Sequence, residues 1–216
     1  MPKVVDHDQR RAEIVLALWQ VIYLQGIDGV SFRSVAKAAE VSVGRIQHYF
    51  SSREEMILDG CRRMVAAAVA DHGPTELPEH PRAARAALTA VLSASLSDGD
   101  EFRMGASVWA AYQAKAVSSP RIAEIVVDAL AERASLLAEL VATARAAPGE
   151  ESASPTEADH AEALHLASLS EGLAHRVLVG AMAASEARRL LDAVVGRCMA
   201  AGSASVLCSP GRDGAR

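Results

Sequence analysis

Apolar residues recur at three- and four-residue spacing through most of the chain, and this spacing constrains the fold more than any other feature. Within residues 8–25, for example, Ile14, Leu18, Val21 and Ile22 fall on one face of a helix. The alternation of apolar and polar residues that is typical of strands is not sustained anywhere, and alanine is abundant. The sequence therefore predicts an all-α fold.

Capping residues and helix breakers divide this fold into about nine helices. Ser31, Ser42 and Thr156 stand where N-caps are expected, and Ser52 with Glu55 has the spacing of a capping box. The expected helices cover residues 8–25, 31–39, 43–49, 52–72, 82–97, 100–117, 120–146, 156–180 and 184–201. The tail after residue 202 has no apolar periodicity, and we expect it to be disordered.

Composition narrows the classes of function. The net charge of −5 argues mildly against a nucleic-acid partner, but residues 31–53 hold four basic side chains and one acidic one. No apolar run approaches the roughly 18 residues that span a bilayer, and residues 1–9 lack the apolar part of a signal peptide, so we expect a cytoplasmic protein. The three cysteines have no paired spacing, so no disulfide framework and no metal site are expected, and no cofactor motif occurs.

Residues 31–53 carry the pattern that says most about function. Two short helices joined by Glu40-Val41-Ser42 have the length of a helix-turn-helix motif. Five apolar residues would form a core shared with the first helix: Val35, Ala36, Val41, Ile46 and Phe50. The other positions of the second short helix are small or polar, as required of a helix that enters the major groove and reaches base edges. The alternative is an ordinary helical bundle in which Arg33 and Arg45 are solvated surface charges.

The stretch from Arg11 to Met56, above all G-R-I-Q-H-Y-F at residues 44–50, resembles the N-terminal domain of the TetR family. Beyond residue 60 the resemblance is reduced to helix count and chain length. The G-R-I-Q-H-Y-F variant looks most like family members whose C-terminal domain resembles that of betaine-pathway regulators. The resemblance implies a helix-turn-helix DNA-binding domain at residues 1–55, a ligand-binding and dimerisation domain at residues 56–202 and a tail at residues 203–216. It also implies a homodimeric repressor, bound to a palindromic operator in double-stranded DNA and released by a small molecule.

The resemblance further implies roles for single residues. Arg45 and Gln47 would read base edges, because Arg can bind guanine and Gln can bind adenine through two hydrogen bonds each. Arg33 would reach a base or a phosphate, and other phosphate contacts would come from Ser42, His48, Tyr49 and Arg53. The family usually has glycine where this chain has Glu40, so a positive φ at Glu40 would strain the backbone by about 1–3 kcal/mol.

A cluster of aromatic residues marks a candidate effector site in the middle of the chain. Phe102, Trp109 and Tyr112 lie at spacings of seven and three residues, so they share a helical face with Gln113. The resemblance implies that a mainly apolar ligand would bind beside this face, with Met64 of the fourth helix as a wall. The alternative is that these large residues simply fill the core.

The last two expected helices are apolar on more than one face, which requires two packing partners for each helix. The resemblance implies that they build a dimeric four-helix bundle. The residues expected at this dimer interface are Leu166, Leu169, Leu173, Val177, Leu190, Val194 and Cys198.

Two other classes of function, a metal enzyme and a structural scaffold, are alternatives to DNA binding. Glu162-x-x-His165 has the spacing of a ligand pair in ferritin-like metal enzymes, but those proteins need a second such pair, and the sequence has none. A purely structural helical scaffold would leave Arg45, Gln47 and His48 without a role. Motifs of nucleotide-binding loops and of serine hydrolases are absent, so we expect no enzyme activity.

Overall fold

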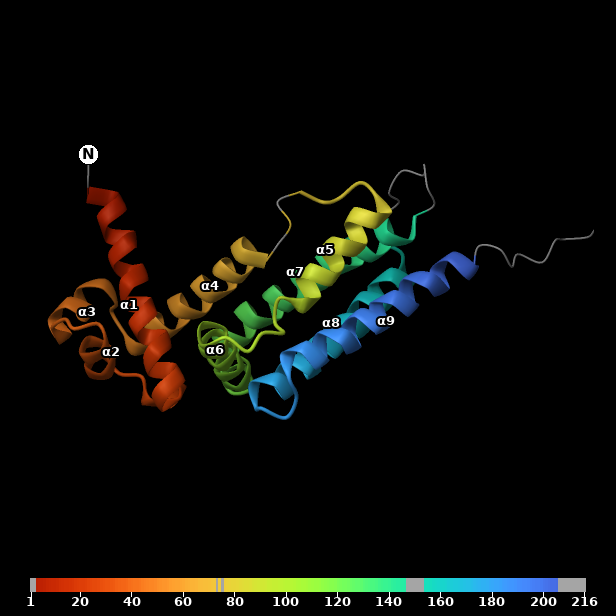
Figure 1. Cartoon of the computed structure of the whole chain (residues 1–216). Coiled ribbons are helices and arrows are strands. Elements are labelled where there is room, and N and C mark those ends of the chain that lie inside the picture. The colour runs from red at the N-terminus through yellow and green to blue at the C-terminus, as the bar shows by residue number, and fades with distance from the viewer. Residues whose placement is uncertain (1–2, 73, 75, 147–153, 206–216) are drawn as a thin grey trace, which may run out of the picture. The chain divides into compact units, whose positions relative to one another are not determined.

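The computed structural model describes residues 3–72, 74, 76–146 and 154–205. Within them the chain is all-α, as predicted, and contains no strand (Figure 1). A short 3-10 turn, η1 (Ile27–Gly29), precedes the second helix. The helices are α1 (Lys3–Gln25), α2 (Phe32–Ala38), α3 (Val43–Tyr49), α4 (Arg53–His72), α5 (Pro81–Ser93), α6 (Asp100–Ala116), α7 (Pro120–Arg145), α8 (Glu157–Leu178) and α9 (Ala184–Ser205).

Three helix ends differ from the expectation by more than two residues. Helix α1 begins five residues earlier, at Lys3 rather than Asp8, because polar residues without a breaker can continue a helix. Helix α5 ends at Ser93, four residues before the predicted Ser97, and the turn that follows it buries Leu96. Helix α9 extends through the predicted tail as far as Ser205. The rest of that tail, residues 206–216, lies outside the described residues.

The chain forms two compact units, and the first comprises Met1–Asp71 and Gly99–Leu130. Its core is built around Leu18 of α1, which is buried with Ile46, Met56, Leu58 and Tyr112. The helix-turn-helix therefore shares its core with α4, α6 and the first part of α7, which lie beyond the predicted boundary after residue 55. The sequence could not reveal this, because the apolar face of a helix does not indicate which other helix it packs against.

The second unit comprises His72–Asp98 and Ala131–Arg216. Helices α8 and α9 run side by side in it, and α5 packs against both of them (Figure 1). Leucine is the most frequent residue in its core: Leu88, Leu92, Leu96, Leu137, Leu140, Leu166, Leu173 and Leu191.

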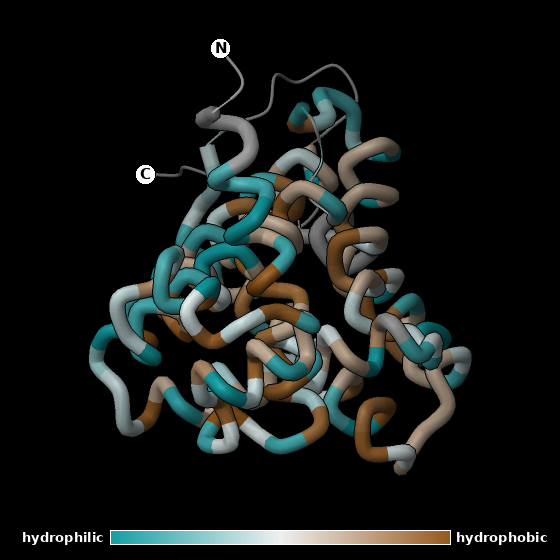
Figure 2. The backbone as a smooth tube through the Cα atoms, turned by 90° about the vertical axis from the view of Figure 1, so that its left-hand side faces the viewer, coloured by the Kyte–Doolittle hydropathy of each residue, from teal (hydrophilic) through white to brown (hydrophobic). Residues whose placement is uncertain are grey.

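Hydropathy is distributed along the helices as expected for helices with one buried face. In Figure 2 hydrophobic stretches alternate with hydrophilic ones along the tube. None of the helices in the described part of the chain is long and apolar enough to cross a membrane.

Candidate nucleic-acid interface

Helix α2 is fixed at its start by a reciprocal capping box. The amide of Ser34 donates to Oγ of Ser31 at 3.0 Å, and the amide of Ser31 donates to Oγ of Ser34 at 2.8 Å. Val35 and Ala36 are buried in the core of the first unit. Helix α2 is thus held at its end and along one face, and it leaves Arg33 exposed on the other.

The turn between α2 and α3 contains a strained residue. Glu40 has a φ of 54°, the left-handed conformation expected from the glycine usually found there. The Glu40 amide donates to the oxygen of Lys37 at 3.4 Å, and the Val41 amide donates to the oxygen of Ala36 at 3.0 Å. This pair of hydrogen bonds is a Schellman motif, so helix α2 ends in the ordinary way on a residue poorly suited to the position.

Helix α3 presents polar side chains on one face and buries the other. Ser42 caps its start, because Oγ of Ser42 accepts from the Arg45 amide at 3.2 Å. Ile46 is buried on one side of the helix, whereas Arg45, Gln47 and His48 are exposed. Arg45 and Gln47, which are predicted to contact bases, are therefore both exposed on a helix whose buried side is anchored in the core.

Arg11 of α1 ties the end of α3 to α4, a role that the sequence did not indicate. Its guanidinium donates to the main-chain oxygen of Tyr49 at 2.9 Å and pairs with Asp59 at 3.2 Å and Glu55 at 3.4 Å. It also lies 4.3 Å from the centre of the Phe50 ring. Because these partners are 38 to 48 residues away in sequence, no local pattern could have revealed the contact.

The start of α4 has a modified form of the predicted capping box. The Glu55 amide donates to Oγ of Ser52 at 3.0 Å, as predicted, but the Glu55 carboxylate accepts from Ser51 instead of Ser52. The side-chain and backbone hydrogen bonds of Ser51, aided by Arg11, hold the pKa of Glu55 below its ordinary value. The carboxylate therefore stays charged at neutral pH and continues to bind Arg11.

Arg53 has a role different from the predicted one. Its guanidinium donates to the main-chain oxygens of Val30 at 2.6 Å, Ile27 at 2.8 Å and Asp28 at 3.4 Å. These three oxygens belong to the turn between α1 and α2, so Arg53 fastens α4 to that turn. Nε and Nη2 of Arg53 are therefore engaged within the protein, and the expected phosphate contact stays a prediction.

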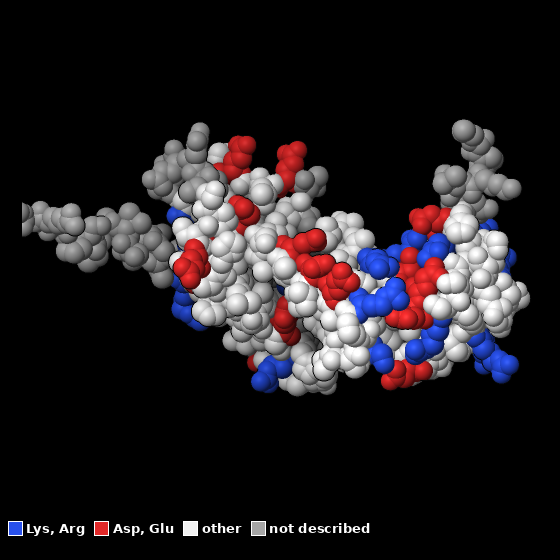
Figure 3. All heavy atoms as spheres, turned by 180° about the vertical axis from the view of Figure 1, so that it is seen from behind, with Lys and Arg blue, Asp and Glu red and all other residues white. Residues whose placement is uncertain are grey.

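A cluster of three aromatic rings adds a residue that sequence reasoning missed. The ring of His7 in α1 lies 4.9 Å from that of Tyr49, and the ring of His48 lies 5.0 Å from Tyr49. The start of α1 therefore adjoins the end of α3, at His48 and Tyr49. Over this end of the molecule, in the view of Figure 3, basic and acidic side chains are interspersed.

The residues predicted to line an effector site all lie in the first unit. Tyr112 is fully buried, and its hydroxyl donates to the oxygen of Ile57 at 3.2 Å, so it fills the core as the alternative reading held. Burial raises the pKa of Tyr112 well above its usual value. Trp109 and Met64 are half-buried and pack against the same core, and Phe102 and Gln113 are half-buried as well.

The predicted dimer residues fall into two groups. Leu166, Leu173 and Val177 are buried within the chain's own core, so they are not available to a partner, and the prediction is corrected for these three. Leu169, Val194 and Cys198 are half-buried, and Leu190 is 45% exposed. Helix α8 also carries an apolar residue on its outward side, Leu164, which is 59% exposed.

The surroundings of Glu162, His165 and Cys61 favour neither metal binding nor thiol chemistry. Glu162 pairs with Arg145 at 3.1 Å, and His165 is exposed. Among the described residues no group of three or more His, Cys, Asp or Glu side chains could hold a metal ion. Cys61 is buried, and burial raises the pKa of its thiol to about 11, which disfavours the reactive thiolate.

Comparison with known protein families decides the relationship suggested by the helix-turn-helix. The model of the C-terminal domain of BetI-type transcriptional repressors matches residues 83–200, and that of bacterial regulatory proteins of the tetR family matches residues 14–59. The chain belongs to the TetR family. The TetR family consists of transcriptional regulators, so the metal-enzyme and scaffold alternatives are not favoured.

Individual relatives in the TetR family support the same assignment over parts of the chain. The regulator PksA of Bacillus subtilis is 46% identical over 57 residues, which are 26% of this chain and 28% of PksA. BetI of Burkholderia thailandensis is 28% identical over 125 residues, which are 56% of this chain and 62% of BetI. The chain thus spans less than two thirds of the length of either protein.

Solved structures extend the likeness to the whole fold. A transcriptional regulator from Rhodococcus sp. Rha1 superposes with a TM-score of 0.75 and 26% identity, covering 93% of this chain and 99% of the regulator. A regulator from Saccharomonospora viridis, solved in complex with choline, has a TM-score of 0.70 and 21% identity, covering 88% of this chain and 96% of the regulator.

Proposed function

We propose that this TetR-family protein is a transcriptional repressor that binds a palindromic operator through α3. The observation that carries the proposal is the exposed set of Arg45, Gln47 and His48 on a short helix whose buried face, at Ile46, is fixed in the core. Arg45 would bind guanine and Gln47 would bind adenine in the major groove. Phosphate contacts from Arg33, Ser42, His48 and Tyr49 would set the position of the helix.

The test compares two exposed arginines of the same unit. Arg45→Ala should weaken binding to the cognate duplex by about 1–3 kcal/mol and relax the base preference at one position. Arg62→Ala, which removes an exposed arginine of α4, is the control and should leave base preference unchanged. Binding is measured by fluorescence anisotropy on genomic fragments at about 50–100 mM salt, because such contacts depend on ionic strength. Failure to bind any palindromic duplex contradicts the proposal.

The repressor would act as a homodimer. A two-fold axis would place the two α3 helices about 34–36 Å apart, one turn of DNA, which a palindrome matches. The outward apolar side chains of α8 and α9, among them Leu164 and Leu190, support an interface on these helices. Binding to chromosomal DNA would take place in the cytoplasm.

Release from DNA would follow the binding of a small, mainly apolar molecule beside Trp109, Phe102 and Gln113, with Met64 of α4 at the wall. Helix α4 contains 20 residues, so it is about 30 Å long, and Arg53 fastens its start to the turn before α2. A ligand that displaces α4 near Met64 would therefore shift the helix-turn-helix. By linkage the operator must weaken ligand binding by the same factor, commonly about 5–150-fold.

A fluorescence screen tests this effector site. A Trp19→Phe variant leaves Trp109 as the reporter, and choline is a first compound because the Saccharomonospora viridis regulator was solved with it. Compounds that quench the fluorescence of Trp109 should cause the protein to release operator DNA. Trp109→Ala should reduce this release without weakening DNA binding. If inducers are found whose potency is unchanged by this substitution, the effector site lies elsewhere, and the DNA-binding proposal is unaffected.

A further inference from the structure

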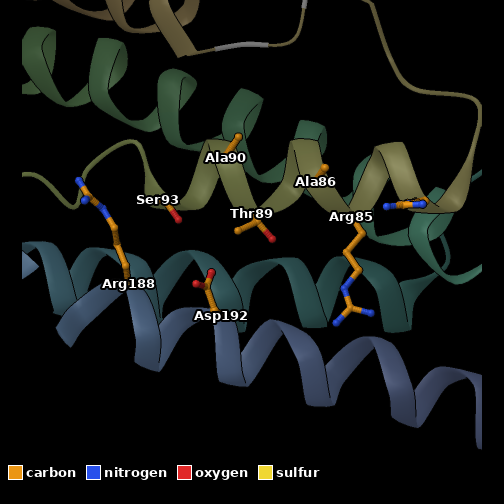
Figure 4. A pocket seen from close by; sticks show the side chains of 8 residues that line it. Arg85, Ala86, Thr89, Ala90, Ser93, Arg188 and Asp192 are labelled. Carbon is orange, nitrogen blue, oxygen red and sulfur yellow. The ribbon is translucent and has the colours of Figure 1, made fainter. Parts of the chain in front are cut away.

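A second candidate site lies in the second unit, in a hollow between α5 and α9 (Figure 4). It is an open groove with a volume of about 580 Å³. One face of α5 contributes Arg82, Arg85, Thr89 and Ser93, and the facing side of α9 contributes Arg188 and Asp192. None of these residues has a role in the proposed DNA or effector sites.

Small residues keep this hollow open. Ala86 and Ala90 line it on α5, where larger side chains would fill it. The Arg85 side chain reaches α9 at Gly196, where a Cβ would be in ordinary van der Waals contact with it, 3.5 Å from Nη2 of Arg85. The space between the helices is therefore bordered by polar side chains and floored by methyl groups.

The charges around the hollow are unbalanced. Three guanidinium groups and one carboxylate line it, and none of the four forms an ion pair within the described residues. Guanidinium groups bind carboxylate and phosphate oxygens through paired hydrogen bonds, and gathering three of them along one groove favours an anion there. Thr89 and Ser93 add hydroxyl groups that can donate to the same oxygens.

The charges are also ordered along the groove. Helices α5 and α9 run in opposite directions, so Ser93 lies near Arg188 at one end, whereas Arg85 lies at the other (Figure 4). Arg85 reaches α9 at Gly196, eight residues beyond Arg188, which corresponds to about 12 Å along the helix. Asp192 and Thr89 lie between these ends. A single acidic group in the middle would face Asp192, whereas acidic groups at both ends would face arginines.

We propose that this hollow binds an elongated small molecule with an acidic group, carboxylate or phosphate, at each end. Arg82 and Arg85 hold one end, Arg188 holds the other, and Asp192 accepts a hydrogen bond from a hydroxyl or amino group between them. The site is separate from the proposed effector site, because its lining belongs entirely to the second unit.

Calorimetric titration of the full chain at constant ionic strength tests the proposal with three simple acids. Suberate, which carries a carboxylate at each end of a long chain, should bind saturably. Malonate is too short to reach both ends and octanoate has one acidic group, so each should bind at least about ten-fold more weakly. Equal binding of octanoate and suberate would overturn the two-ended arrangement.

Substitutions in the lining assign the binding to this hollow. Arg85→Gln and Arg188→Gln should each weaken suberate binding about ten-fold, and Asp192→Asn should strengthen it, because suberate has no group for that carboxylate. Arg189→Gln makes the same charge change on the next residue of α9 and should have no effect. The proposal is overturned if Arg85→Gln and Arg188→Gln weaken suberate binding no more than Arg189→Gln does. It is also overturned if Arg85→Gln or Arg188→Gln changes self-association, measured by sedimentation, without changing suberate binding.

Discussion

Tyr112 of α6 and Gly60 of α4 are in such close contact that no side chain fits between them. A Cβ built at Gly60 would lie 2.6 Å from the Tyr112 hydroxyl and 2.6 Å from Cδ2 of Leu18. Trp19 of α1 donates to the main-chain oxygen of Gly60 at 3.2 Å. Helices α1, α4 and α6 therefore meet at Gly60, which joins the helix-turn-helix to the region of the proposed effector site.

Gly60→Ala should lower the free energy of unfolding by up to about 2 kcal/mol, although alanine is the better helix former. The crowding of two fully buried side chains costs about 1–3 kcal/mol, which exceeds the gain in helix propensity of about 1 kcal/mol. Urea unfolding followed by circular dichroism measures the change. Tyr112→Phe in the Gly60→Ala background removes one of the crowding atoms and should recover part of the loss. An unchanged or raised stability of Gly60→Ala would mean that the helices are not tightly packed here.

Arg53→Gln should destabilise the protein by about 1–3 kcal/mol, because three main-chain oxygens lose a charged donor. Arg45→Gln should leave stability unchanged and reduce operator binding. Thermal melts and DNA titrations of both variants separate the roles of the two arginines. If Arg53→Gln melts like the wild type but loses affinity for every duplex, Arg53 contacts a phosphate and its hydrogen bonds to the turn do not stabilise the fold.

Glu40→Gly should stabilise the protein by roughly 1 kcal/mol, because glycine adopts a positive φ without the strain that Glu40 bears. Glu40→Ala removes the same charge but keeps the Cβ, so it serves as the control and should give no such gain in urea unfolding. Operator binding by the two variants separates charge from strain, since removing the acidic group near DNA should strengthen binding in both. Equal stability of all three proteins would show that the turn relieves the strain in another way.

The success of the sequence in predicting the helix-turn-helix and its failures elsewhere have a common physical cause. Ser31 and Ser42 act through hydrogen bonds to amides three residues away, so their roles can be read from local spacing. Arg11 and Arg53 act on partners more than 20 residues distant, and a surface arginine has the same local pattern whether it binds phosphate or a carbonyl oxygen. The α8 rows of Leu164 and Leu166 are both apolar, and only packing decides which faces inward.

Leu164→Glu combined with Leu190→Glu should convert a dimer into monomers. A two-fold interface would contain each substitution twice, and placing like charges opposite one another in an interface costs several kcal/mol. Val127→Glu on α7, where the side chain is 60% exposed, makes the same change outside the proposed interface and should leave the dimer intact. Sedimentation velocity distinguishes the species. A persisting dimer in the double variant would place the interface on other elements.

Asp159 should make the stability of the second unit depend on pH. Its carboxylate accepts from Thr156 and pairs with Arg145 at 3.0 Å, joining the start of α8 to the end of α7. Burial alone would raise the pKa of Asp159, but the hydrogen bonds from Thr156 and Arg145 outweigh that effect and hold the pKa below its ordinary value. A lowered folded-state pKa stabilises the protein above the unfolded-state value of about 3.9, and this contribution is lost as the pH falls through the folded-state value.

Asp159→Asn should therefore cost about 1–3 kcal/mol at pH 7, where the charged hydrogen bonds are fully formed in the wild type. The difference between the two proteins should shrink as the pH falls below about 4, because the carboxylate of the unfolded wild-type chain then takes up a proton, and it should go on shrinking until the folded protein binds the proton as well. Urea unfolding at pH 7, 5 and 3.5 measures this convergence. Asp128→Asn removes an exposed carboxylate of α7, and its free energy of unfolding should differ little from that of the wild type at every pH. A cost of Asp159→Asn that stays constant down to the lowest pH would mean that the lost interaction does not depend on the charge of Asp159.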